Sequence, residues 1–170
     1  EPVACVLVAG GYGAAPLFML SEALRARGCR VDMILGAATE DRLFGVLEAK
    51  RSSASVTVTT DDGSAGLRGR VTDPLAEIVR ASDADVIYAC GPMAMLASVA
   101  AVAADTGAHS QCAVEEAMAC GIGVCMTCVL PVQGADGITR MFRSCTDGQV
   151  FRGSDVRWAD VETVPAGTLG

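Results

Sequence analysis

Short apolar runs alternate with helical patterns along the first two-thirds of the chain. Runs of strand length, apolar or rich in β-branched residues, occur at 4–10, 30–37, 55–60, 85–91 and 109–116. Between them, apolar positions recur with helical spacing, or capping residues precede a short helical stretch, at 16–28, 39–46, 72–81 and 92–107. This alternation predicts an α/β fold with a parallel, doubly wound sheet over residues 3–116.

The pattern changes after Glu116. A cysteine-rich loop is followed by short pieces such as "VLPVQ", "TRMFRSC" and "GQVF", which are separated by Gly and Asp. Such pieces are typical of hairpins. We therefore expect two parts, an α/β domain over 1–116 and a small hairpin-rich appendage over 117–170.

Charge and hydropathy narrow the function classes. The chain has 13 Lys and Arg against 20 Asp and Glu, a net charge of −7, and no basic run, so it lacks the charge pattern of a nucleic-acid-binding protein. The stretch 86–104 is uncharged and nearly long enough to span a membrane. Gly91 and Pro92 interrupt it, however, and much of it is alanine, so a strand, a turn and a buried helix fit better. Partners should be small molecules or proteins.

Eight cysteines in a chain that is 51% hydrophobic point to metal or redox chemistry rather than to a disulfide framework, because the apolar core needs no covalent support. The first residues show no basic region or cleavage pattern of a secretory signal. We therefore expect a reducing, cytoplasmic location. His109 is the only histidine, so catalytic triads and histidine-rich metal sites have little support.

A glycine-rich loop joins the first predicted strand to the first helix. Gly10, Gly11 and Gly13, with Pro16, form "GGYGAAP" at this junction. In an open α/β sheet this loop meets the carboxyl ends of the strands, where a pyrophosphate can contact backbone N–H groups and a helix N-terminus. The alternative is a glycine turn that serves tight packing only.

Pro16 stands where the usual dinucleotide fingerprint has its third glycine. "GGxGxxPL" followed by "CGP" after a later strand instead resembles the nicotinamide-binding domain of the ferredoxin-NADP reductase superfamily. The second motif is Cys90-Gly91-Pro92-Met93. The resemblance implies that both loops flank one cofactor crevice and that the Cys90 thiol lies near the nicotinamide, where it helps to position the ring. Alternatively, Cys90 is an ordinary buried cysteine.

Acidic residues follow two of the predicted strands, Glu40 and Asp41 after the second and Asp61 and Asp62 after the third. Carboxylates at such positions suit ribose hydroxyls and repel a 2′-phosphate. Because Arg42 is the one base nearby, NADH is preferred over NADPH.

Four cysteines, Cys120, Cys125, Cys128 and Cys145, have the spacing C-x4-C-x2-C-x16-C. The first three match the plant-type arrangement for a [2Fe–2S] cluster, in which a loop wraps the iron and a distant cysteine completes the coordination. Gly121 and Gly123 would curl that loop so that backbone N–H groups face sulfur. Zinc is the main rival, although structural zinc sites usually carry two short cysteine knuckles. The other cysteines, including Cys5, Cys29 and Cys112, fit a core.

The combination of motifs resembles the electron-transfer subunits of NAD-dependent dihydroorotate dehydrogenases. The resembling segments are "AGGYGAAPL", "TDDGSAGLRGRVTD", "CGPMAML", "EEAMACGIGVCMTC" and "SCTDGQVF". The resemblance implies a nicotinamide-binding domain at 1–116, a [2Fe–2S] appendage at 117–170, and cofactors NAD(H), the cluster and FAD. In that family a β-barrel FAD domain precedes the nicotinamide domain. This chain lacks the FAD motif, so we expect it to be inactive alone.

The same resemblance implies a hetero-oligomer in pyrimidine biosynthesis. Its partner would be an FMN-containing catalytic subunit that oxidises dihydroorotate. Two oxidoreductase rivals share the domain plan, the γ subunit of a sulfhydrogenase and the small subunit of a ferredoxin-NADP transhydrogenase. A rival from another class is a zinc-stabilised α/β binding module without redox function.

Overall fold

A seven-stranded sheet forms the centre of the computed structural model, which describes residues 2–168. The strand order is β4-β3-β2-β1-β5-β6-β9, with all neighbours parallel except β6 and β9. The bounds are β1 Ala4–Gly10, β2 Arg30–Ala37, β3 Ser55–Thr60, β4 Leu67–Arg68, β5 Val86–Cys90, β6 His109–Ala113 and β9 Val150–Arg152.

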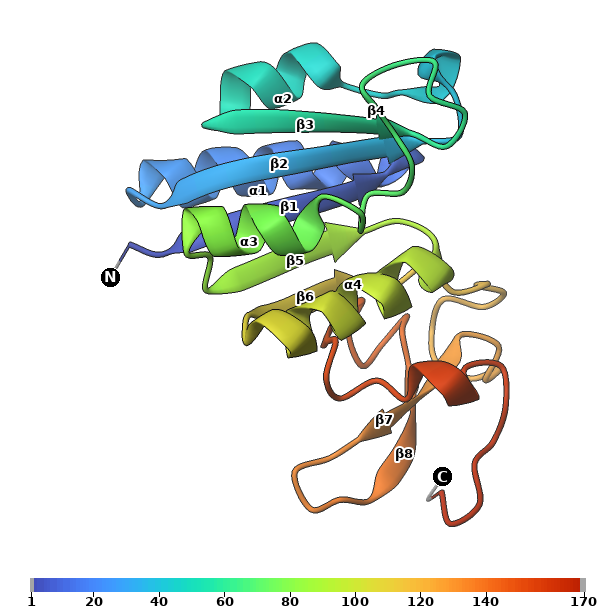
Figure 1. Ribbon diagram of the computed structural model, residues 1–170. Helices are drawn as coiled ribbons and strands as arrows, with labels where there is room; N and C mark the ends of the chain where they lie inside the picture. The colour runs from blue at the N-terminus through green and yellow to red at the C-terminus, as the bar shows by residue number, and fades with distance from the viewer. Residues whose placement is uncertain (1, 169–170) are drawn as a thin grey trace.

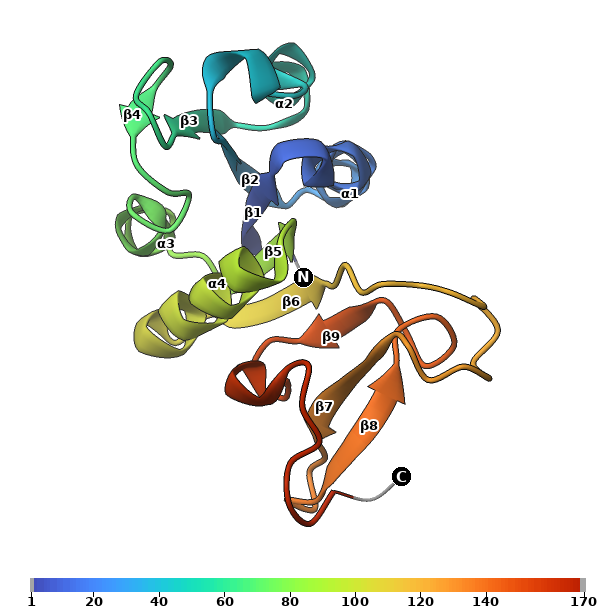
Figure 2. The same cartoon turned by 90° about the vertical axis from the view of Figure 1, so that its right-hand side faces the viewer.

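Helices cover both faces of this sheet (Figures 1 and 2). One face carries α1 (Ala14–Ala26) and α2 (Val46–Ser52), and the other carries α3 (Leu75–Ser82) and α4 (Met93–Thr106). Short 3-10 turns lie at Gly11–Gly13 (η1), Glu40–Arg42 (η2) and Trp158–Asp160 (η3). The expected doubly wound α/β fold is therefore confirmed.

The central strand β1 is apolar throughout because both of its sides are covered. Val6 and Val8 lie in the core beneath α3 and α4, whereas Leu7 lies in the core beneath α1; all three are fully buried. The uncharged stretch 86–104 divides into β5, a turn and α4. No helix among the described residues is long and apolar enough to cross a membrane.

The helix expected over 39–46 is wrong. The chain forms η2, passes through extended Leu43, and begins α2 only at Val46. Gly45 explains the late start, because its φ of 73° is left-handed and a side chain there would overlap the ring of Phe18. The two-residue strand β4 was not expected from the sequence.

The C-terminal part combines a hairpin with a strand that returns to the main sheet. β7 (Val129–Gln133) and β8 (Thr139–Arg143) form the expected hairpin. β9, however, pairs with β6, and Phe151 of β9 packs edge-on against Phe142 of β8, with ring centroids 6.2 Å apart. One hydrophobic core thus runs from the main sheet into the hairpin and includes residues on both sides of the boundary expected at 116.

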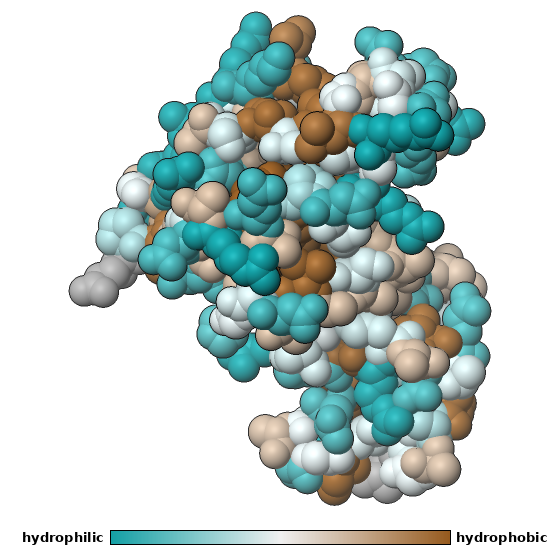
Figure 3. Space-filling view, viewed as in Figure 1, coloured by the Kyte–Doolittle hydropathy of each residue, from teal (hydrophilic) through white to brown (hydrophobic). Residues whose placement is uncertain are grey.

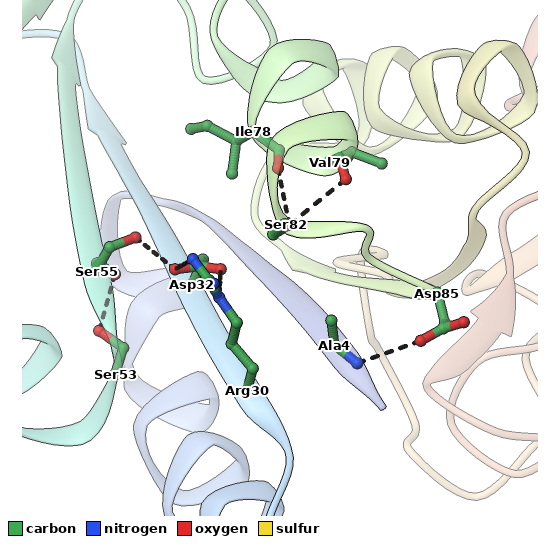
Figure 4. A network of polar contacts seen from close by, with 9 residues as sticks. All are labelled: Ala4, Arg30, Asp32, Ser53, Ser55, Ile78, Val79, Ser82 and Asp85. Carbon is green, nitrogen blue, oxygen red and sulfur yellow. Dashed lines mark hydrogen bonds and ion pairs between the residues drawn. The ribbon is translucent and has the colours of Figure 1, made fainter. Parts of the chain in front are cut away.

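Polar contacts tie the strands together at the end opposite to the glycine loop (Figure 4). The buried carboxylate of Asp32 accepts hydrogen bonds from Arg30 Nε at 2.9 Å and from Ser55 Oγ at 2.6 Å. Asp85 Oδ2 accepts one from the Ala4 N–H. The buried Asp32 is thus satisfied within the fold, as buried polar groups usually are, and these contacts are structural. On the face of the molecule that Figure 3 shows, hydrophilic residues are mixed with scattered hydrophobic ones, as is usual for a protein surface.

Candidate functional site

The two glycine-containing loops meet at the centre of the sheet, where the strand order reverses. β1 lies next to β5, and Ala9 pairs with Cys90, so both strands end at the same level. In open α/β sheets a ligand binds outside the carboxyl ends of the strands at this switch point. The structure therefore brings together the two motifs that the sequence placed on separate strands.

The two loops touch through their backbones. A side chain at Gly13 would overlap the carbonyl oxygen of Cys90. Gly91, with φ +153°, approaches Gly10 so closely that a Cβ there would lie 3.0 Å from the Gly10 nitrogen. Pro92 and Met95 close the other side of Gly10. These glycines are required for the packing of the two loops against each other. In the sequence analysis, tight packing was only the alternative to a ligand-binding role.

Gly13→Ala is expected to lower the free energy of unfolding by about 1–3 kcal/mol, the usual cost of forcing extra volume into a packed site. Gly11→Asn is the control, because Gly11 has open space around it and Asn tolerates its φ of +55°. Denaturant unfolding measures both variants. Equal stability of the two would show that the loops are not in contact.

Gly11 and the start of α1 lie at the open side of the crevice, where there is room for a ligand. α1 begins at Ala14, and Pro16 stands in its first turn, where a missing N–H costs nothing. The 13-residue helix directs its free N–H groups and positive dipole end to the carboxyl edge of the sheet. That end suits an anionic group such as a pyrophosphate.

A cavity of about 310 Å³ lies along the carboxyl ends of β2 and β3. Thr59, Asp61 and Arg70 line its polar side, and Pro92 of the second motif and Met95 of α4 close it. The Thr59 hydroxyl is buried and has no hydrogen-bond partner among residues 2–168. An unpaired buried hydroxyl is costly, so it offers a contact to a polar ligand group. The sequence reading missed Thr59 and Arg70, although Arg70 lies within a segment that carried the resemblance.

The acidic residues singled out from the sequence gather at the outer end of this edge. Glu40, Asp41 and Asp62 line one shallow hollow with Ser64, whereas Asp61 lines the cavity that contains Thr59. Hydrogen bonds from Ser64 hold the pKa of Asp62 below its usual range, so this carboxylate is charged. Arg42, expected as the nearest base, lies on η2 and does not line the cavity, in contrast to Arg70.

Cys90 is nearly buried at the end of β5, with 8% of its surface exposed. Burial raises the pKa of its thiol, and the nearby Glu115 carboxylate raises it further. A raised pKa keeps the thiol neutral at physiological pH. Cys90 is therefore a poor nucleophile, which agrees with a role in positioning a ligand. Glu115 was not identified as a site residue from the sequence.

The four cysteines of the loop region form two pairs. Cys120 contacts Cys125, and the N–H groups of Ile122, Cys125 and Val124 converge on the Cys120 sulfur. These N–H groups, with that of Ile122 contributing most, lower the pKa of Cys120 to about 6. The loop therefore stabilises a thiolate, the form that binds metal.

The second pair joins the loop to the turn after β8. The N–H of Cys145 faces the Cys128 sulfur and lowers its pKa, while the hydrogen bond between the two side chains raises the pKa of Cys145. Ser144, next to them, has a buried side chain that faces the Cys128 sulfur and lowers the pKa of that thiol further. Gly121 and Gly123 have φ values of +68° and +79°, which gives the loop the expected curl.

This pairing distinguishes between the two metal sites considered. A zinc site needs four ligands around one ion. Two pairs of thiols instead fit two irons that are each held by two cysteines. With their inward N–H groups, the residues fit a [2Fe–2S] cluster. All eight cysteines are free thiols, and Cys5 and Cys112 are buried in the core.

Comparisons with known proteins agree with both halves of the site. Residues 7–101 match the family model of the oxidoreductase NAD-binding domain. Residues 115–157 match that of the iron-sulfur cluster binding domain of dihydroorotate dehydrogenase B. The resemblance inferred from the motifs is thus confirmed.

Curated relatives carry the same description. The chain is 37% identical to the electron transfer subunit of dihydroorotate dehydrogenase B (NAD(+)) from Listeria welshimeri, over 92% of this chain and 59% of that protein. It is 40% identical to the corresponding subunit from Geobacillus thermodenitrificans, over 89% and 56%. The chain thus spans somewhat over half the length of the curated relatives that it matches.

A solved structure is also similar. It is described as an NADH-dependent reduced ferredoxin-NADP oxidoreductase and studied for flavin-based electron bifurcation. The TM-score is 0.79 at 33% identity, covering 95% of this chain and 57% of that one. The fold and the arrangement of the two parts therefore occur in an electron-transferring protein.

Proposed function

Because this chain belongs to the oxidoreductase NAD-binding domain family and carries the iron-sulfur binding domain of dihydroorotate dehydrogenase B, we propose that it is the electron transfer part of such an enzyme. The observation that carries the proposal is the meeting of the two glycine loops at the switch point, in a chain that continues directly into the paired cysteines.

In the proposed nicotinamide site, the role of this chain is to bind the dinucleotide and to orient it. The N–H groups at Gly11 and at the start of α1 hold the pyrophosphate, and the cavity beside Asp61 holds the adenosine end. Gly10, Gly13, Gly91 and Pro92, with Met93 at the start of α4, shape the crevice. The neutral Cys90 thiol packs beside the nicotinamide ring.

In the proposed cluster site, Cys120 and Cys125 would hold one iron, and Cys128 and Cys145 would hold the other. A bound nicotinamide would exchange a hydride with FAD, and a [2Fe–2S] cluster would carry single electrons between FAD and the partner. Electrons released when the partner oxidises its substrate would then end on NAD+. We assign FAD to the part of the relatives that this chain does not span. The chain alone would then be inactive as a dehydrogenase.

The nucleotide assignment is tested at Gly11, where a side chain has room. Asp and Asn both tolerate the left-handed conformation there, but Asp adds a negative charge beside the pyrophosphate. Gly11→Asp is expected to weaken NADH binding by about tenfold, which is about 1.4 kcal/mol, relative to Gly11→Asn. Fluorescence titration with NADH measures both. Equal affinities would place the nucleotide elsewhere.

The proposal also includes a partner subunit and a preferred nicotinamide nucleotide. We propose an FMN-containing catalytic subunit that oxidises dihydroorotate, a hetero-oligomeric enzyme, and NADH rather than NADPH, since the carboxylates of Asp61 and Asp62 after β3 would repel a 2′-phosphate. Eight free thiols agree with the reducing cytoplasm.

The similarity to the ferredoxin-NADP oxidoreductase structure favours a second candidate, the small subunit of a ferredoxin-linked transhydrogenase. Copurification from the source cells separates the two. An FMN-containing partner with dihydroorotate oxidase activity supports the first, and a partner that oxidises NADPH supports the second.

A further inference from the structure

An ion pair lies beside the cysteines at the end of β8. Arg143 contacts Asp147 through two parallel hydrogen bonds, Nε to Oδ2 at 3.1 Å and Nη2 to Oδ1 at 3.2 Å. The same Oδ2 accepts the Arg143 N–H at 2.8 Å. Cys145 lies within the turn that these bonds close. The ion pair therefore fixes the segment that carries the fourth cysteine.

The remaining guanidinium nitrogen reaches across to the cysteine loop. Arg143 Nη1 donates a hydrogen bond of 3.2 Å to the carbonyl oxygen of Gly123. The N–H of Gly123 in turn faces the sulfur of Cys145. Gly123 has φ +79°, and a Cβ there would lie 3.0 Å from Thr146, so loop and turn are in close contact. Arg143 thus joins the two segments that supply the four cysteines.

The charge of Arg143 also acts on this region. The guanidinium is positively charged at any physiological pH, and Arg143 belongs to the same turn as Cys145. Arg143 is thus a permanent positive charge close to the second cysteine pair, and Asp147 is a negative charge beside it. Both side chains are partly exposed, at 39% and 26%, so solvent weakens their effect without removing it.

We propose that Arg143 is a positioning residue that holds the cysteine loop against the Cys145 turn, and that its charge, opposed by Asp147, sets how readily the bound cluster accepts an electron. The inference rests on the proposed iron-sulfur function. A cluster gains one negative charge on reduction, so a nearby cation favours the reduced form. Net charge and hydrogen bonds around the sulfurs are known determinants of cluster potential.

The test is a redox titration of the anaerobically isolated protein, followed by visible absorbance and EPR. Arg143→Gln is expected to disfavour reduction by up to about tenfold, which is about 59 mV for one electron. Asp147→Asn is expected to shift the potential in the opposite direction, and the double variant should return close to wild type. Arg143→Lys retains the charge but loses the paired hydrogen bonds, so its potential should stay near wild type while the cluster is lost faster.

Arg140 provides a matched control. It forms an ion pair of 2.7 Å with Asp136 in the same hairpin, and within residues 2–168 it makes no hydrogen bond to the cysteine loop. Arg140→Gln should leave the potential unchanged. Shifts of the same sign in Arg143→Gln and Asp147→Asn, or an equal shift in Arg140→Gln, would overturn the inference while leaving the cluster assignment intact. A wild-type protein without a cluster would overturn the proposed function and this inference with it.

Discussion

Replacing Cys125 with serine is expected to remove the iron-sulfur chromophore. Cys125 is the exposed member of the first pair, and in the proposed site it supplies one of two thiolates to an iron. Serine is a much weaker ligand for iron, which prefers thiolate in such clusters. Iron content should fall by more than about tenfold, because even changes outside the ligand set cost that much in metal sites. Visible absorbance and iron analysis after anaerobic isolation measure the loss.

Cys29→Ser is the matched control. Cys29 is half-buried beside the core under α1 and lies outside the cysteine loop. This variant should keep its iron and its spectrum. NADH binding should survive in both variants, since the glycine loops belong to the other part of the chain. Full iron content in Cys125→Ser would contradict the ligand assignment.

Phe151→Ala is expected to destabilise the whole molecule by about 3–5 kcal/mol, the usual cost of removing a buried aromatic ring. Phe151 is 8% exposed, and it belongs to the core that runs from the main sheet into the hairpin. Its strand is also the one strand in residues 2–168 through which the C-terminal part pairs with the main sheet. The loss should therefore unfold the cluster-binding part together with the sheet edge.

Val150→Ala is the control for this experiment, because Val150 lies on the same strand but is 56% exposed. Its effect should stay within about 0.5 kcal/mol, as for most surface substitutions. Denaturant unfolding monitored by circular dichroism measures both variants, and iron release monitors the cluster-binding part. If Phe151→Ala unfolds the cluster-binding part and leaves the stability of the sheet unchanged, the two parts do not share a core.

Much of the fold could be predicted from local patterns. The buried strands were recognisable because parallel strands covered on both faces read as continuous apolar runs. The helix at 39–46 was misplaced because the decisive contact, Gly45 against Phe18, joins two helices that are far apart in sequence. The return of β9 to β6 was missed for the same reason, since "GQVF" looks like any short hairpin strand.

Candidate site residues could be proposed from the sequence where a motif has fixed spacing, as with the four cysteines and the two glycine loops. Thr59 and Arg70 were not, because only the folded chain brings the end of β3 and the following loop to the same cavity. Gly13 was expected to contact the nucleotide, whereas its backbone contact with Cys90 became visible only in three dimensions. The spacing of the motifs in the sequence therefore indicated the kind of site. The fold then separated the residues needed for packing from those that are free to contact a ligand.

The central claim is that the paired cysteines hold a [2Fe–2S] cluster. It is tested most directly by metal and sulfide analysis of the anaerobically isolated protein, with an EPR spectrum after dithionite reduction. We predict two irons and two sulfides per chain, a coloured protein, and a paramagnetic signal that appears on reduction by one electron. A colourless protein that stays EPR-silent and contains one zinc per chain would contradict the account.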